Sequence, residues 1–290
     1  MTENVRNVIV HYHIFKNAGT TVDAILHANF PATNGAVEGK YPWDTLTNQD
    51  LLDFILANPR LDVISSHQAR FPLPQHPNLR VHPIVFLRHP IDRVESVYHF
   101  ERQQAPDSLS PSVRIAQNTD LKGFVEWGLS DQGTAVFRNF QTIHIAGRQR
   151  DMRSARASHT DYLVASSRLR ELPFVGIVDR FEDSAIALQR KLRSNFPAID
   201  CSARAVLNRS EGRADSLSAR IERIASDLGD TLFDHLLSQN RFDLDLYMQA
   251  VFLGGERKRA KRAARSAHKS DLYITLLVKC GSSGTPIYHP

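Results

Sequence analysis

The chain has 290 residues, of which 42% are hydrophobic and 23% charged, values of a folded globular protein rather than a disordered or fibrous one. No stretch approaches the roughly 18 consecutive apolar residues that a membrane span needs, and the opening MTENVRNVIV lacks the basic and then apolar order of a signal peptide. The two cysteines, Cys201 and Cys280, form no disulfide framework or metal-ligand spacing, in keeping with a reducing cytoplasm.

The net charge of +5 arises from one basic segment near the C-terminus. Residues 256–269 hold seven Lys or Arg and one acid, which leaves the rest of the chain with a net charge of −1. We therefore expect one main domain, residues 1–253, followed by a basic tail, residues 254–290. Such a tail either contacts phosphates or an anionic membrane surface, or is simply a solvated basic end.

Apolar, β-branched runs alternate with helical patterns along the main domain. We expect strands at 5–15, 61–67, 80–88 and 174–179. We expect helices at 20–29, 49–57 (capped by Asn48), 90–104, 121–129, 135–146, 160–172 and 182–196, and a helical region over 217–253 interrupted near Gly229 and Asn240. Residues 70–80 and 106–119 are predicted to be loops.

Strands separated by helices predict an α/β fold, a three-layer sandwich with a central parallel sheet and helices on both faces. In such sheets ligands bind beyond the carboxyl ends of the strands. The turns after the first three predicted strands are therefore the places to look for a site.

The first of these turns reads HIFKNAGTT. The first amides of the following helix lack partners within the helix, and with the helix dipole they form an anion site. Gly19 allows close backbone approach, Thr20 and Thr21 add hydroxyls, and Lys16 adds a cation. The alternative is a helix start beside an incidental surface lysine. The order differs from the nucleoside-triphosphatase loop GxxxxGK[ST], so no Mg²⁺ is implied.

The third turn reads VFLRHPIDRVESVYHF. Arg88 ends the strand, and Ser96 follows about two turns into a helix that Pro90 can start. An arginine and a serine placed in this way can converge on one phosphate, with the guanidinium binding in bidentate fashion. The alternative is that Arg88 pairs with Asp92 or Glu95 and Ser96 has no role.

Together these motifs resemble the sulfotransferases of the carbohydrate type related to heparan sulfate 2-O-sulfotransferase. HIFKNAGTT is similar to their 5′-phosphosulfate loop HIPKTAGTS, and LRHPIDRVESVYHF to their 3′-phosphate segment LRDPVERVVSxYxF. The resemblance continues in order through 138–147, 174–192 and 240–250. Here Phe15 replaces the usual proline, Asn17 a threonine and His89 an acid. None of these changes removes a group that is expected to bind phosphate.

The resemblance implies a P-loop-like nucleotide-binding sulfotransferase fold, with 3′-phosphoadenosine 5′-phosphosulfate as donor, adenosine 3′,5′-bisphosphate as product and no metal. Lys16 would stabilise the charge on the oxygen that bridges sulfur and phosphorus. The residues implied for donor binding are Lys16, Asn17, Ala18, Gly19, Thr20, Thr21, Arg88 and Ser96, with Arg209 and Ser210 in the segment LNRSEGR as further candidates. That segment could equally be the turn before a helix.

A general base must take a proton from the acceptor. His67 in ISSHQARF ends the second predicted strand, and a histidine occupies the similar stretch of the heparan-type enzymes. His13 and Glu101 are competing candidates. Arg138 and Gln141 are candidate acceptor contacts, or residues of a helix surface.

We therefore expect a cytoplasmic, bacterial enzyme that transfers a sulfuryl group to a hydroxyl or amine of a glycan, glycolipid or small-molecule acceptor, with no nucleic-acid partner. The rival hypotheses are a nucleotide kinase, a nucleotide- or anion-binding protein without turnover, and a binding protein driven by the basic tail. The sequence leaves the acceptor and the oligomeric state open.

Overall fold

The structure is a computed structural model that describes residues 5–105, 108, 110–148, 155–201 and 216–254. The chain divides into two compact units, Met1–Ala250 and Val251–Pro290. Of the second unit only 251–254 are described, and they are helical. The predicted basic tail lies otherwise outside the described residues.

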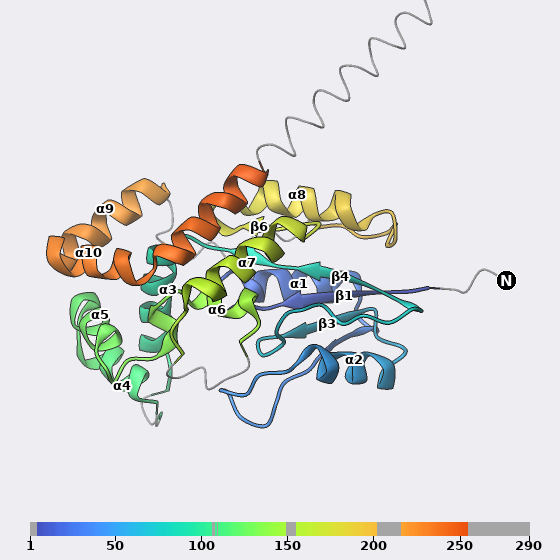
Figure 1. Cartoon of the computed structure of the whole chain (residues 1–290), viewed down its shortest axis with the longest axis horizontal. Helices are drawn as coiled ribbons and strands as arrows, with labels where there is room; N and C mark the ends of the chain where they lie inside the picture. Colours follow the sequence, from blue (N-terminus) through green and yellow to red (C-terminus); the bar gives the residue numbers. More distant parts are fainter. Residues whose placement is uncertain (1–4, 106–107, 109, 149–154, 202–215, 255–290) are drawn as a thin grey trace, which may run out of the picture. The chain divides into compact units, whose positions relative to one another are not determined.

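A central parallel sheet with helices around it forms the first unit, as expected of an α/β fold (Figure 1). The four-stranded sheet has the order β2-β3-β1-β4, and a two-stranded parallel sheet joins β5 and β6. The strands are β1 (Arg6–Tyr12), β2 (Asn34–Ala36), β3 (Val63–Ser66), β4 (Leu79–Ile84), β5 (Phe86–Leu87) and β6 (Gly176–Ile177).

Alternation along β1 determines which side chains meet which layer. Ile9 packs in an apolar core with helix α1 (Gly19–Asn29) and helix α8 (Phe181–Leu192). His11 and His13 follow at intervals of two and therefore point to the same side, toward α1. Tyr12 points to the opposite face, where its ring stacks on Phe71.

The remaining helices match predicted helical segments, except for α4. They are α2 (Asn48–Ala57), α3 (Pro90–Arg102), α4 (Pro111–Asn118), α5 (Leu121–Leu129), α6 (Phe140–Ala146), α7 (His159–Glu171), α9 (Leu217–Leu228) and α10 (Asp230–Gln239), after which 241–254 are helical, and the 3₁₀ turns are Ala135–Phe137 and Val178–Arg180. A second apolar core forms among α3, α4, α5, α9 and α10.

Several sequence-based boundaries are wrong. The predicted strand 80–88 is interrupted at Val85, so that β4 joins the large sheet and β5 the small one. The predicted loop 106–119 contains α4, and the predicted helix 135–146 is a 3₁₀ turn followed by α6. The predictions missed β2 altogether. Its sequence, NGA, carries no strand propensity, and only pairing with β3 makes it a strand.

The start of α2 also differs from the prediction, because Thr47 rather than Asn48 is its N-cap. The Thr47 hydroxyl accepts from the Asp50 amide, and the Asp50 side chain accepts from the Thr47 amide, which forms a capping box.

Among the described helices, none combines the length and the apolar character that crossing a membrane requires.

Candidate active site at the carboxyl edge of the sheet

Three turns meet where parallel strands end side by side. β3 and β4 flank β1 in the sheet, and β5 continues the chain after β4 (Figure 1). The loop 13–18 follows β1, His67 follows β3, and Arg88 follows β5. The structure therefore gathers most of the sequence-predicted candidates at one edge of the sheet.

The loop after β1 has a backbone shape that few residues adopt. Lys16 and Ala18 both have positive φ, 64° and 61°. Ala18 is the N-cap of α1 and its side chain caps none of the first amides. Its carbonyl accepts from the amides of Thr21 and Val22 at 3.1 Å each, which leaves those of Gly19 and Thr20 uncapped. A loop that holds two non-glycine residues in this region stores backbone strain, which is typical of functional turns.

Buried amides hold this loop in place. Asn17 donates from Nδ2 to the Phe86 carbonyl at 2.7 Å and to Gln141 Oε1 at 2.8 Å. Gln141 exchanges hydrogen bonds with both the amide and the carbonyl of Arg88, at 3.0 Å each. Gln141 Nε2 also donates to Asp243 at 3.3 Å. Asn17 therefore anchors the loop through its buried side chain, and its backbone amide donates to the Ile14 carbonyl at 3.1 Å within the loop.

Arg88 is buried, and it pairs with Asp92 through Nε at 2.5 Å, as the alternative interpretation predicted. Glu95 instead pairs with Arg223 at 2.8 Å. Arg88 also donates from Nη1 to the Lys16 carbonyl at 3.2 Å. Among the described residues its other terminal nitrogen, Nη2, has no hydrogen-bond partner. A carboxylate on Nε orients a guanidinium without occupying that nitrogen, so pairing with Asp92 is compatible with phosphate binding.

One face of α3 connects the two cations of the site. Asp92, Ser96 and Phe100 are spaced by four residues and so lie one above another on the helix. Arg88 pairs with Asp92 at one end of this row, and Lys16 Nζ lies 4.5 Å from the centre of the Phe100 ring at the other. The half-buried Ser96 therefore lies between the positions that hold Arg88 and Lys16.

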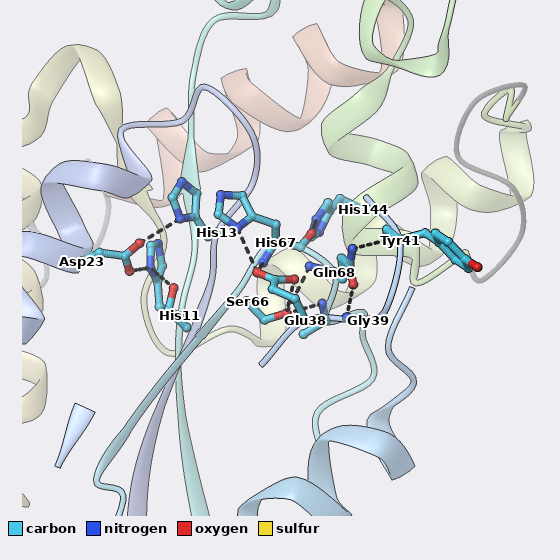
Figure 2. A network of polar contacts seen from close by, with 12 residues as sticks. His11, His13, Asp23, Glu38, Gly39, Tyr41, Ser66, His67, Gln68 and His144 are labelled. Carbon is cyan, nitrogen blue, oxygen red and sulfur yellow. Dashed lines mark hydrogen bonds and ion pairs between the residues drawn. The ribbon is translucent and has the colours of Figure 1, made fainter. Parts of the chain in front are cut away.

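His67 is an exposed histidine with an oriented ring (Figure 2). Its Nδ1 lies 2.9 Å from Glu38 Oε1, and its amide donates to the same oxygen at 2.8 Å. Burial raises the pKa of Glu38, but the hydrogen bonds from His67 outweigh it and leave the pKa below its ordinary value. A carboxylate at Nδ1 selects the tautomer with the proton there and leaves Nε2 as the basic atom.

The backbone of His67 is fixed as well. Arg70 Nη1 donates to the His67 carbonyl at 2.9 Å and contacts Nε2 of His144 at 2.8 Å. The same nitrogen lies 3.1 Å from the His67 carbonyl oxygen, which only accepts. Because an arginine donates only and its contact is the shorter, we assign this His144 nitrogen as the acceptor from Arg70, in a neutral ring. Burial, together with the charge of Arg70, holds the pKa of His144 well below its ordinary value.

His13 lies between His67 and the loop after β1. The register of β1 and β3 places Tyr12 opposite Ser66, so the next residues of the two chains, His13 and His67, are neighbours. Their rings stack with centroids 3.8 Å apart (Figure 2). The other side of the His13 ring abuts Gly19, where an added Cβ would lie 1.9 Å from ring atom Cδ2. The His13 ring therefore leaves no room for a side chain at Gly19.

Asp23 on α1 binds two histidines at once. Its carboxylate oxygens lie 2.6 Å from His11 Nδ1 and 2.9 Å from His13 Nδ1 (Figure 2). Burial raises the pKa of Asp23, but these two hydrogen bonds outweigh it and hold the pKa well below its usual range. Burial lowers the pKa of His13, against the opposing effect of Asp23.

The same three side chains have the donor chemistry for a transition metal, and their ligand atoms lie within 4.8 Å of one another. Ligand atoms around tetrahedral zinc are separated by about 3.3 Å, given bonds of about 2.0 Å. The separations from Asp23 to His11 and His13, 2.6 and 2.9 Å, are those of hydrogen bonds. We therefore assign this cluster to hydrogen bonding.

The polar groups of the two candidate acceptor contacts, Arg138 and Gln141, are engaged within the fold. Arg138 donates to the carbonyls of Gly128 and Ser130 at 2.9 and 3.0 Å, at the end of α5, and the amide group of Gln141 is saturated by the contacts described above. Both residues are buried, so the expectation of a helix surface is wrong, and their polar groups serve the fold.

Three candidates remain. Two of them, Arg209 and Ser210, lie outside the described residues. Glu101, a competing base, is half-buried on α3, and burial raises its pKa against the opposing effects of Ser112 and the charge of Lys16.

Sequence reasoning missed the carboxylates that orient the histidines. Glu38 follows the unrecognised strand β2, and Asp23 is an ordinary acidic residue in an amphipathic helix. Neither carries a local motif. Asp23 could have been suspected, because a strand that sends His11 and His13 to the face covered by α1 needs a polar partner on that helix.

Comparison with known proteins identifies a related protein but no function. No protein-family model matches the chain. An uncharacterized protein of the archaeon Archaeoglobus fulgidus is 32% identical over 252 residues, which cover 85% of this chain and 96% of the archaeal one. A match of this length includes nearly all of the archaeal protein, and the chain belongs to the same family as that protein.

Proposed function

We propose that the chain is a metal-independent sulfotransferase that uses 3′-phosphoadenosine 5′-phosphosulfate, on a P-loop-like fold of the sulfotransferase kind. One observation carries the proposal: a carboxylate-oriented histidine, His67, lies a single imidazole away from the loop after β1, which also holds Lys16. Gly19, His13 and His67 are in successive contact. In the proposal, His67 is the base and Lys16 the cation that stabilises the leaving group.

The phosphosulfate donor carries phosphate groups at two positions, and the carboxyl edge of the sheet offers two groups of hydrogen-bonding residues for them. The first amides of α1, with Thr20 and Thr21, suit the 5′-phosphosulfate. Arg88 Nη2 and the hydroxyl of Ser96 suit the 3′-phosphate, since Arg88 pairs with Asp92, the first residue of the row along α3 that contains Ser96. Lys16 lies at the other end of this row, beside Phe100.

In the transfer step the acceptor oxygen forms a bond to sulfur as the bond from sulfur to the bridging oxygen breaks in line with it. The electron pair goes to that bridging oxygen, which stays on the departing adenosine 3′,5′-bisphosphate, and Lys16 stabilises its charge. His67 Nε2 takes the proton of the acceptor hydroxyl. The acceptor remains a hydroxylated glycan, glycolipid or small molecule, or an amine.

A nucleotide kinase is the nearest rival among enzymes. It requires Mg²⁺ and a phosphate-loop lysine placed directly after the last glycine, whereas here Lys16 precedes Gly19 by three residues. A binding protein without turnover would need neither His67 nor its carboxylate partner. The paired His67 and Glu38 favour an enzyme.

Calorimetric titration with adenosine 3′,5′-bisphosphate, adenosine 5′-phosphate and ATP tests the donor assignment. We expect the bisphosphate to bind at least 10-fold more tightly than the other two, without added Mg²⁺. Lys16→Ala should leave bisphosphate affinity within a few fold and lower turnover of the phosphosulfate donor by about 100-fold or more, the scale of lost transition-state charge stabilisation. Lys191→Ala, on the exposed surface of α8, is the matched control. Equal affinity for the three nucleotides would contradict the proposal.

A further inference from the structure

We propose that donor binding places a proton on His13, and that the stacked His67 is thereby kept neutral, in the form that accepts the proton of the acceptor. The inference rests on the proposed function and adds to it a second histidine with a different task. His13 is an anion ligand loaded by the donor, and His67 is the base.

The orientation of the His13 ring is the first reason. Its Nδ1 is committed to Asp23, so the proton of the neutral ring lies on Nδ1. The opposite edge, Cδ2 and Nε2, faces Gly19 at the start of α1, the residue where the proposed anion loop becomes a helix. A proton added to Nε2 would therefore point a charged donor toward the region where the 5′-phosphosulfate is expected.

The charges around His13 decide when that proton is bound. The groups that face it are His11 on β1, Asp23 on α1, His67 after β3 and His144 on α6. Asp23 is the only acid among them, and it is shared with His11. His13 is buried, lies near three other imidazoles and shares the Asp23 carboxylate with His11. Burial, with these neighbours, lowers its pKa, so we take His13 to be neutral in the free protein.

An anionic donor reverses this balance. Its 5′-phosphosulfate brings negative charge to the Nε2 edge of the ring, while Asp23 already holds Nδ1 on the other edge. A cationic imidazole with a carboxylate at one nitrogen and an anion at the other is stabilised at both. The proton comes from solvent and returns to it when the bisphosphate product leaves, so the cycle is balanced.

The stack with His67 makes the proton on His13 matter for catalysis. Two imidazolium rings with centroids 3.8 Å apart repel each other, so the pair carries one charge at a time. A proton on His13 therefore leaves His67 neutral, with its own Nδ1 held by Glu38 and its Nε2 lone pair available. Donor binding would in this way prepare the base before the acceptor reacts.

Proton uptake on binding tests the inference directly. Adenosine 3′,5′-bisphosphate is titrated calorimetrically at pH 7.5 into the full-length protein in two buffers of low and high ionisation enthalpy. We expect wild type to take up a proton on binding, up to about one per site, and its affinity to fall by up to about 10-fold per pH unit on the alkaline side. His13→Gln should show neither, because its amide can donate but does not titrate. His67→Asn should retain both.

Nuclear magnetic resonance of the imidazole nitrogens of wild type gives a second readout that needs no variant to fold. On addition of the bisphosphate, both His13 nitrogens should become protonated while His67 stays neutral. Uptake that is equal in wild type and His13→Gln, or a proton that appears on His67 instead, would overturn the inference and leave the sulfotransferase proposal standing. Failure of wild type to bind the bisphosphate would instead remove the proposed function.

Discussion

Arg88 donates from Nη1 to the carbonyl oxygen of Lys16 at 3.2 Å, and so joins the two halves of the proposed donor site. The same guanidinium is oriented by Asp92 through Nε. Under the proposed function, Arg88 supports the loop that binds the 5′-phosphosulfate and offers Nη2 to the 3′-phosphate. Its substitution should therefore affect both ends of the donor.

Arg88→Ala should lower the affinity for adenosine 3′,5′-bisphosphate by about 10- to 100-fold, the scale of one or two lost charge-assisted hydrogen bonds. Affinity for adenosine 5′-phosphate should fall by less, because only the support of the loop is lost. Arg102→Ala, exposed on the same helix, is the control and should change neither affinity in calorimetry. Equal losses for the two nucleotides would mean that Arg88 only supports the loop.

Gly19→Ala should disrupt the site through His13. The added Cβ would lie 1.9 to 2.5 Å from three atoms of the imidazole, so one of the two residues must move. We expect a loss of roughly 1–3 kcal/mol in the free energy of unfolding, as for other overpacked positions.

The double variant Gly19→Ala with His13→Ser separates this clash from backbone effects. It should regain most of the stability lost by Gly19→Ala, measured by urea denaturation, without regaining bisphosphate affinity. No recovery of stability would place the conflict elsewhere in the loop.

Glu38→Gln should lower turnover by about 10-fold, because the uncharged amide oxygen of glutamine accepts the hydrogen bond from His67 Nδ1 more weakly than a carboxylate does. His67→Asn should lower it by about 100-fold or more, the range of general base catalysis. Adding Glu38→Gln to His67→Asn should cost little further, because the carboxylate acts through the ring. Losses that multiply in the double variant, measured as steady-state kcat, would show that Glu38 has a separate role.

Stability should fall as the pH drops below about 6.5, the value of an unperturbed histidine. The pKa of buried His144 lies well below that value in the folded protein, so between the two values the unfolded chain binds one more proton. The stabilisation is complete above the unfolded pKa and is lost at about 1.4 kcal/mol per pH unit below it. The lowered pKa of His13 acts in the same direction.

Denaturant unfolding between pH 5 and pH 7.5 measures this slope. His144→Gln, whose amide oxygen can still accept from Arg70, should reduce the slope by about 1.4 kcal/mol per pH unit. His159→Gln, exposed at the start of α7, should not change it. An unchanged slope in His144→Gln would mean that His144 titrates alike in both states.

Removal of metal should have no effect. The oxygens of Asp23 are engaged by the two histidines at hydrogen-bonding distance, and the transfer chemistry that we propose needs no divalent ion. After dialysis against a chelator, we expect an unchanged melting temperature and unchanged bisphosphate affinity. A lower melting temperature that Zn²⁺ restores would instead identify His11, His13 and Asp23 as a metal site.

The local motifs of the chain correctly placed the loop that ends in Gly19, the helix that Pro90 begins, and Arg88 at the end of a strand. Each of these depends on neighbours in sequence: a glycine turn, the restricted φ of proline, or an apolar run. For the same reason the helix 121–129 was predicted with the bounds of α5.

Contacts between distant segments could not be predicted in this way. Arg138 and Gln141 read as polar residues of a helix, but Gln141 is buried because its amide joins Asn17, Arg88 and Asp243. Likewise the strand 80–88 is one apolar run in sequence, and only its two sets of strand partners divide it at Val85.

The sequence by itself determined the alternation of strands and helices, and thereby the edge of the sheet at which Lys16, His67 and Arg88 gather, because strand ends and helix starts are fixed by local backbone preferences. The tertiary structure alone decided how those groups are paired. Glu38 reaches His67 and Asp23 reaches both His11 and His13 across strand register and helix packing, and these depend on the burial of the whole core rather than on any short stretch of the chain.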